Sequence, residues 1–231
     1  MKERRIIDFH AHILPGADHG SDGIKTTKAQ LSALYDKGVL QVVATPHFYP
    51  QRDSAESFLK RREESVKAFL QLDCKERPHV AVGAEVLVCS GLDHMPGLSE
   101  LCIVGTDVLL LEMPYTAWRI EHIEAVKKIS RQGYTVVMAH IDRYPLESVM
   151  SLASQCDVLY QINASALKRI GGKRRVLELC EELCVAAIGS DIHGRDNRAA
   201  SRLSRLNAYL FRCGKCVFEE SEGLLKNARL I

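Results

Sequence analysis

The sequence predicts an α/β fold in which strands and helices alternate around a parallel sheet. Short apolar runs rich in Val and Ile alternate with amphipathic segments along the chain, as in repeated β-α units. Several of these runs are apolar almost throughout, which is typical of strands buried on both faces. Because α/β barrels of about this size fold as one unit, the 231 residues are expected to form a single domain over residues 1–231.

Seven strands are expected, each an apolar run that polar or turn residues interrupt. The candidate strands are Arg5–His10, Val39–Thr45, His79–Val86, Asp107–Glu112, Thr135–Ala139, Asp157–Ile162 and Val185–Ser190. Seven strands with helices between them favour a TIM-like barrel of (β/α)7 type over an open, doubly wound sheet. The apolar pattern alone does not separate these two arrangements.

Helices are expected between the strands, where apolar residues recur at helical spacing. Two of these segments stop near glycines, Gly38 and Gly133, which commonly end helices. The expected helices are Thr26–Lys37, Ser57–Leu72, Ile120–Arg131, Leu167–Leu183, Ala200–Leu210 and Ser221–Ala228.

The composition and the apolar pattern argue against a nucleic-acid partner, a membrane span and a secretory leader. The 31 basic and 29 acidic residues leave a formal net charge of +2, which gives no argument for a nucleic-acid or membrane partner. No run of about 18 apolar residues occurs, so no membrane span is expected. The charged N-terminus is followed by only Ile6 and Ile7 before Asp8, so no secretory leader is expected. We therefore expect a cytoplasmic protein.

The eight cysteines are scattered along the chain and are expected to be reduced, buried residues that serve as small apolar side chains. The pair in Cys213-Gly-Lys-Cys216 could indicate redox chemistry or half of a zinc site. It has no second pair and precedes no βαβ unit, so a structural role is the preferred interpretation.

Histidines and carboxylates gather at the ends of the expected strands. In a barrel of parallel strands these ends lie on one rim, where active sites are built. The spacing in His10-x-His12 and Asp191-x-His193 adds to this, because residues i and i+2 of an extended segment point the same way. The residues in or beside such positions are Asp8, His10, His12, His19, His47, Glu85, Glu112, His140, Asp191 and His193.

This set predicts a metal centre. Imidazole and carboxylate suit zinc, manganese and iron, and the absence of thiolates argues against a closed structural zinc site. Any one of these residues taken alone is more often structural, and His79, His94 and His122 are given that ordinary interpretation. The six histidines together with Glu85, Glu112 and Asp191 exceed what one ion needs, so two or three metals are expected, bridged by Glu85 or another carboxylate. The chain is interpreted as a metal-dependent hydrolase.

The motif Asp8-Phe-His10-Ala-His12-Ile-Leu-Pro-Gly-Ala-Asp18-His19-Gly20 resembles the opening of the PHP (polymerase and histidinol phosphatase) superfamily. More narrowly, the chain resembles the CpsB/CapC branch of bacterial manganese-dependent protein-tyrosine phosphatases. The resemblance runs from residue 6 to the C-terminus and implies a distorted (β/α)7 barrel of PHP type. The later blocks that agree in order and spacing are Ala44–His47, Gly83–Val86, Leu111–Pro114, Ala139–Tyr144 and Ser190–His193.

The resemblance implies three metal positions, with manganese expected and zinc, iron or cobalt as alternatives. The first would be held by His10, His12, Glu85 and Asp191. The second would share Glu85 and add Glu112 and His140. The third would use His19, His47 and His193. Since the tyrosine-phosphatase branch usually has Asp where this chain has His19, the third position is expected to be richer in imidazole and more favourable to zinc or iron.

The resemblance also implies residues that bind substrate. Arg143 matches an arginine of the family, although Asp142 replaces the usual Glu before it, and Arg198 matches a second one. Guanidinium groups suit this role because their fork of donors meets two phosphate oxygens at once. His47 or His193 is assigned as the group that protonates the leaving oxygen.

The function implied is phosphomonoester hydrolysis, with a phosphotyrosine protein as substrate, expected to be a bacterial tyrosine kinase of capsule or exopolysaccharide synthesis. One alternative is a small-molecule phosphatase of histidinol-phosphatase type. Another is a non-catalytic metal-binding regulatory module, which is disfavoured because every ligand position holds a competent residue. Cysteine catalysis is disfavoured because no cysteine has an arginine six positions later.

Aromatic residues in two segments could line the substrate cleft. The segments are Phe48–Asp53 and Tyr115–Arg119, which contain Tyr49, Tyr115 and Trp118. Aromatic residues at the edge of the core are the preferred interpretation of all three. The oligomeric state stays open.

Overall fold

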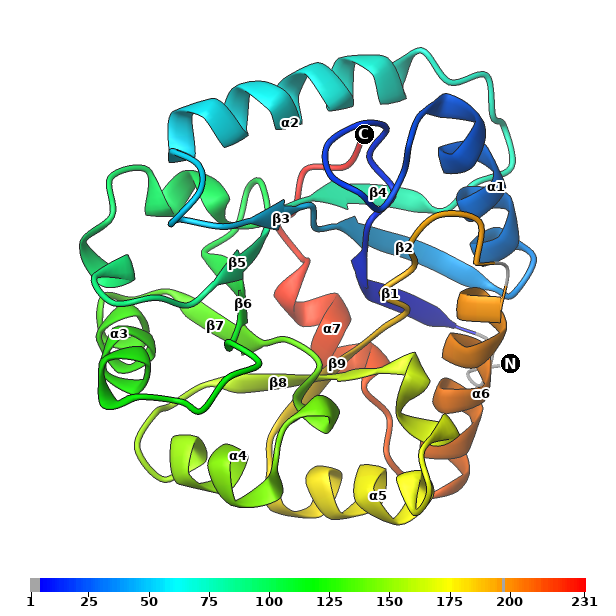
Figure 1. Cartoon of the computed structure of the whole chain (residues 1–231). Helices are drawn as coiled ribbons and strands as arrows, with labels where there is room; N and C mark the ends of the chain where they lie inside the picture. Colours follow the sequence, from blue (N-terminus) through cyan, green and yellow to red (C-terminus); the bar gives the residue numbers. More distant parts are fainter. Residues whose placement is uncertain (1–4, 197) are drawn as a thin grey trace.

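The computed structural model describes residues 5–196 and 198–231 and confirms the predicted α/β barrel, in distorted form (Figure 1). Its strands pair in parallel in two sheets, of order β1-β2-β4 and β3-β5-β6-β7-β8-β9. The strands of the described chain are β1 (Ile6–Ala11), β2 (Val39–Ala44), β3 (His47–Phe48), β4 (His79–Val82), β5 (Glu85–Leu87), β6 (Val108–Glu112), β7 (Thr135–Met138), β8 (Leu159–Asn163) and β9 (Val185–Gly189).

Helices surround the strands in Figure 1, except for α7, which lies within the outline of the strand ring. Phe218 and Leu225 of this C-terminal region join the apolar side chains that fill the barrel, among them Phe9. The α-helices are α1 (Ile24–Tyr35), α2 (Ala55–Leu70), α3 (Ile120–Arg131), α4 (Leu146–Ala153), α5 (Gly172–Glu182), α6 (Arg198–Arg212) and α7 (Phe218–Leu224). The short 3-10 helices are η2 (Leu92–His94), η3 (Leu98–Leu101), η4 (Ile141–Arg143) and η5 (Ala164–Lys168).

In the described part of the chain, no helix combines the length and the apolarity needed to cross a lipid bilayer.

The predicted strand His79–Val86 is wrong in its continuity, because Gly83 divides it into β4 and β5, which belong to different sheets. A similar break occurs in the preceding unit, where Pro46, which lacks a backbone N–H, separates β2 from the unpredicted β3. The two breaks face each other, since Gly83 N donates to Ala44 O at 2.8 Å and Glu85 N donates to Pro46 O at 3.0 Å. As a result β3 and β5 pair with His47 opposite Glu85.

The predicted helix Leu167–Leu183 is also wrong in its first part. The structure has η5 there, followed by a turn at Gly171 with φ +72°, and α5 begins only at Gly172. Helix α4 was not predicted, because its eight residues are too few to show a helical period. Strand β8 begins two residues later than the predicted Asp157–Ile162, and α7 lies earlier than the predicted Ser221–Ala228. The expected burial of the cysteines is wrong for Cys184, Cys213 and Cys216, which are exposed because they lie in connections between elements.

The last strand closes against the first at a very short separation. Asp191 N donates to His10 O at 2.8 Å, and His12 N donates to Ile192 O at 3.2 Å. A Cβ atom placed on Gly189 would lie 2.5 Å from His10 Cβ and 2.8 Å from Gln161 Nε2. The absence of a side chain at Gly189 therefore lets β9 approach His10.

We expect Gly189→Ala to destabilise the protein by about 1–3 kcal/mol, because overpacking would push His10 and its neighbours apart. The measurement is the midpoint of denaturant unfolding. Gly223→Ala in α7 is the matched control, since its Cβ would meet nothing within 4 Å and Ala is the better helix former. Equal midpoints for Gly189→Ala and wild type would show that this close approach is not required.

Candidate metal centre

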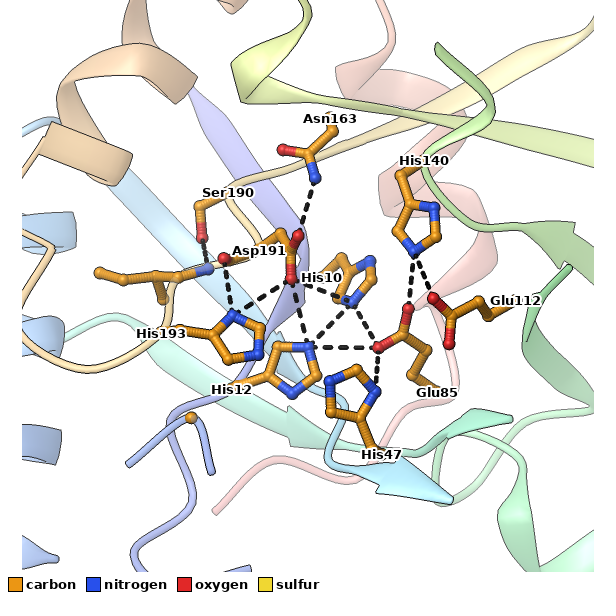
Figure 2. Close-up of polar contacts among 12 residues, drawn as sticks. His10, His12, His47, Glu85, Glu112, His140, Asn163, Ser190, Asp191 and His193 are labelled. Atoms are coloured by element: carbon orange, nitrogen blue, oxygen red, sulfur yellow. Dashed lines mark hydrogen bonds and ion pairs between the residues drawn. The ribbon is translucent and has the colours of Figure 1, made fainter. Parts of the chain in front are cut away.

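The carboxylate of Glu85 lies at the centre of a cluster formed by the carboxyl ends of the strands (Figure 2). Its Oε2 atom is 3.1 Å from His10 Nε2, 3.3 Å from His12 Nε2 and 2.8 Å from His47 Nδ1. Its Oε1 atom is 2.8 Å from His140 Nε2. One buried carboxylate thus contacts imidazoles supplied by β1, β3 and the residues after β7.

The structure brings together the residues assigned to the first two metal positions. Asp191 Oδ1 lies 3.4 Å from His12 Nε2 and 3.8 Å from His10 Nε2, beside Glu85. On the other side of Glu85, Glu112 Oε1 lies 3.4 Å from His140 Nε2. The donor atoms of both sets therefore converge, with Glu85 shared between them.

The residues assigned to the third metal position, His19, His47 and His193, do not all converge. The ring centroid of His19 lies 4.9 Å from that of His47 and 4.8 Å from that of His193. The donor atoms of His12, His47 and His193 lie within 4.8 Å of one another, but among the described residues no such group includes His19. His19 is exposed and sits at the outer edge of the centre.

Several buried polar atoms of the centre have no hydrogen-bond partner. They are Glu85 Oε2, His47 Nδ1 and His193 Nε2, and although the first two lie 2.8 Å apart, their contact lacks hydrogen-bond geometry. Buried polar atoms without a partner are costly, and native proteins leave few of them. Divalent cations would satisfy all three, and imidazole with carboxylate is a donor set that such ions accept. The residues present therefore fit metal ions.

Electrostatics tie metal binding to proton release. Burial raises the pKa of the Glu85 carboxyl, but the charge of His10 and hydrogen bonds from the surrounding imidazoles lower it well below its usual range. Burial lowers the pKa of His140, yet hydrogen bonds to Glu112 and Glu85 outweigh it and raise the pKa to about 9. An ion that binds here must displace such protons, so its affinity falls as the pH falls.

Two residues that sequence reasoning did not assign fix the orientation of the His10-x-His12 pair. Asp18 Oδ2 lies 2.7 Å from His12 Nδ1 and also accepts the His47 backbone N–H at 2.9 Å. Gln161 Oε1 lies 3.3 Å from His10 Nδ1. Because each acceptor holds an Nδ1–H, both Nε2 atoms, 3.1 Å apart, face the centre. Asp18 stands inside the opening motif and could have been found, whereas a lone Gln in a strand gives no such indication.

Two of the candidate ligands, His140 and Asp191, have strained backbone conformations. His140 has φ +34° and Asp191 has φ +50°, a left-handed conformation that non-glycine residues seldom adopt. Each such residue costs of order 1–3 kcal/mol and persists only where the surroundings hold it. Asn163 Nδ2 donates to Asp191 Oδ2 at 3.0 Å and Gln161 Oε1 accepts the His140 N–H at 2.7 Å.

A cavity of about 430 Å³ opens above the centre. Arg143 lines it, donating through Nη1 to Tyr115 Oη at 2.7 Å and pairing through Nη2 with Asp191. Arg52, which was not predicted, also lines it, whereas Arg198 is exposed at the start of α6 and does not. The remaining lining residues are His19, His47, Tyr49, Gln51, Leu87, Glu112, Pro114, Tyr115, Asp191 and His193.

The aromatic residues divide between the cavity and the core edge. Tyr49 and Tyr115 line the cavity, so the core-edge interpretation was wrong for both. Trp118 packs edge-on against Tyr144 at 5.1 Å and donates to Pro114 O at 3.2 Å. That interpretation is confirmed for Trp118.

The sequence of the chain is similar to that of proteins of capsular polysaccharide synthesis. A family model described as capsular polysaccharide synthesis, CpsB/CapC, matches residues 6–220. The CapC protein of Staphylococcus aureus is 25% identical over 98% of this chain and 91% of its own length. The tyrosine-protein phosphatase CpsB of Streptococcus pneumoniae is 27% identical over 84% of this chain and 85% of its own.

A solved structure has the same fold. It comes from work on YwqE of Bacillus subtilis and CpsB of Streptococcus pneumoniae, described as metal-dependent tyrosine phosphatases. The match has a TM-score of 0.79 at 21% identity and covers 98% of this chain and 96% of that one. The distorted barrel of this chain is therefore the fold of that structure.

We expect Asp18→Asn to weaken the binding of divalent metal about 10- to 100-fold, because a neutral amide no longer holds the His12 Nδ1–H as a carboxylate does. Metal affinity is measured by calorimetry or by competition with a coloured chelator. Asp36→Asn is the control, since Asp36 is an exposed carboxylate at the far end of α1. Unchanged affinity in a folded Asp18→Asn protein would contradict the role given to Asp18.

Proposed function

The chain belongs to the CpsB/CapC family, and from this membership we propose that it is a metal-dependent phosphatase that removes phosphate from tyrosine residues of proteins. The observation that carries the proposal is the Glu85 carboxylate with four imidazoles around it, directly below a cavity lined by Arg143. Metal ligands and a phosphate-binding cation thus face the same space.

We propose two to three divalent ions, manganese first among them, with Glu85 shared between neighbouring ions. His10, His12 and Asp191 would hold one ion with Glu85, and Glu112 and His140 would hold a second. A third would be held by His47 and His193 with His19 at its outer edge. Such ions supply a nucleophilic water of lowered pKa and neutralise charge on the phosphate.

The chain's own residues orient the substrate above these ligands. Arg143 is held between Tyr115 and Asp191, so its guanidinium is already placed to bind two oxygens of a phosphate. Tyr49, Tyr115 and Leu87 give the cavity an aromatic and apolar wall that fits the ring of phosphotyrosine. Arg198 keeps its assignment as a second substrate arginine only if a bound substrate extends beyond the cavity.

His47 and His193 both line the cavity and are the proposed donors to the leaving oxygen. His193 carries no imidazolium proton to donate near neutral pH. Burial and the neighbouring charge of His12 lower its pKa to about 4, so it is neutral near pH 7.

The substrate proposed is a bacterial tyrosine kinase of capsule or exopolysaccharide synthesis, which the family description supports. A cytoplasmic location is part of the proposal, because all eight cysteines are free thiols. A single domain is supported by the one family match over residues 6–220. The non-catalytic alternative is disfavoured, since the assigned ligands converge.

We expect the purified protein to hydrolyse p-nitrophenyl phosphate, to lose activity to a chelator and to recover it with manganese, cobalt or zinc. His10→Ala should lose bound metal and activity together, because His10 contacts Glu85 at the centre. Cys213→Ser, a change of an exposed thiol, is the control and should keep both. Activity that survives chelation but is abolished by a thiol alkylator would exclude the metal mechanism.

We expect phosphotyrosine peptides to be hydrolysed with a higher kcat/KM than histidinol phosphate, because the cavity wall is aromatic and apolar. Arg143→Ala should lower kcat/KM for the peptides by about 10²-fold, the usual effect of removing one preorganised donor to a developing charge. Both rates are followed by phosphate release. Faster turnover of histidinol phosphate would favour the small-molecule alternative instead.

A further inference from the structure

A strongly basic stretch lies where the chain leaves β8 at the rim of the barrel. Residues 168–175 read Lys-Arg-Ile-Gly-Gly-Lys-Arg-Arg, and we call them the basic segment. Five of the chain's 31 basic residues fall in these eight positions, together with none of its 29 acidic residues. The segment joins the end of η5 to the first turn of α5. A nearly neutral chain therefore concentrates positive charge at one place.

This charge is mostly not neutralised within the protein. Arg175 approaches Glu178 at 3.9 Å, and Asp196, whose carboxylate lies near Lys168, is already paired with Arg202. In the described residues the members of the basic segment without an ion pair are Lys168, Arg169, Lys173 and Arg174. All four are exposed, so an anionic partner can reach them from solvent.

The basic residues of the segment do not stabilise helix α5. Helix α5 has no acidic residue in its first turn, where Lys173, Arg174 and Arg175 lie instead. Cations near a helix N-terminus oppose the helix dipole, so this arrangement is locally unfavourable. A pattern that breaks a local rule without a local gain is typical of a binding surface.

The basic segment is fixed beside the residue proposed to bind phosphate. Arg169 Nη1 donates to the carbonyl of Asp142 at 2.6 Å, and Arg175 Nη2 donates to the carbonyl of Tyr144 at 3.2 Å. These two carbonyls lie on either side of Arg143, whose guanidinium lines the cavity. The basic segment is therefore anchored to the backbone on both sides of a residue that lines the cavity.

We propose that the basic segment binds an acidic stretch of the substrate polypeptide, so that the preferred substrates carry carboxylates or further phosphates near the phosphotyrosine. This inference rests on the proposed function and adds the substrate class. An extended peptide advances about 3.3 Å per residue, so positions a few residues from the phosphotyrosine reach the segment. Ile170, a fully exposed apolar side chain within it, offers the same peptide an apolar contact.

The test compares two phosphotyrosine peptides, one with Glu on both sides of the phosphotyrosine and one with Ser and Gly there. The variant is Lys173→Glu with Arg174→Glu, two exposed changes that suit a helix N-terminus and so preserve the fold. The matched control is Lys37→Glu with Lys75→Glu, exposed residues that precede β2 and β4 at the opposite end of the barrel. All three proteins are assayed with both peptides and with p-nitrophenyl phosphate.

We expect the variant to lose about tenfold in kcat/KM for the acidic peptide, since attractive charges become repulsive. Its rates with the neutral peptide and with p-nitrophenyl phosphate should stay within about twofold of wild type, and the control should match wild type throughout. Raising the ionic strength to about 0.5 M should abolish the wild-type preference for the acidic peptide.

Equal losses for both peptides, or none for the acidic one, would overturn the inference. The inference would also be overturned if the variant kept its turnover of the acidic peptide but lost binding to vesicles containing phosphatidylserine. That result would indicate that the basic segment binds a membrane surface instead. Failure of the proposed function looks different: no phosphotyrosine peptide would be hydrolysed by any of the proteins. Binding of phosphonate analogues of the two peptides, followed by fluorescence anisotropy, would then still show or refute a preference that depends on the segment.

Discussion

The buried carboxylate of Glu85 is the constraint on which the rest of the structure depends. A carboxylate that is 1% exposed is expensive unless opposite charges or hydrogen-bond donors surround it. Here its neighbours come from β1, β3 and the end of β7, and His47 reaches it only because β3 and β5 pair with these two residues opposite each other. That pairing requires the breaks at Pro46 and Gly83. The departure from a regular barrel is therefore what assembles the centre.

The features that destabilise the folded state are concentrated at the carboxyl ends of the strands. Left-handed backbone at His140 and Asp191 and the close approach at Gly189 all lie within the centre or beside it. The barrel interior is by contrast filled with ordinary apolar side chains, such as Phe9, sealed below by α7. The apolar core thus supports strained backbone and buried polar atoms at the carboxyl ends of the strands. Cations bound there would stabilise the folded state, because they would pair with the polar atoms that lack a partner.

Sequence reasoning succeeded where a residue's place follows from a local pattern. Apolar runs placed the strands, and the position of polar residues after such runs predicted which side chains converge, because parallel strands end on one rim. It failed where position depends on distant contacts. The division at Gly83 comes from pairing with β2, and the role of Gln161 depends on two histidines far away in sequence. Loop side chains such as Arg52, whose direction no periodicity fixes, were missed for the same reason.

The negative charge at the carboxyl ends of the strands favours the binding of cations. Asp18, Glu85, Glu112 and Asp191 place four carboxylates around the centre, and protonation of His12 and His140 offsets only part of their charge. A phosphate monoester dianion entering the cavity would meet this negative field at short range, against which the cavity lining offers only the guanidinium groups of Arg143 and Arg52. Divalent ions reverse the sign of the field where the phosphate must sit. The basic segment lies further out and acts at longer range, so it would attract an acidic substrate without competing for the carboxylates that would hold the ions.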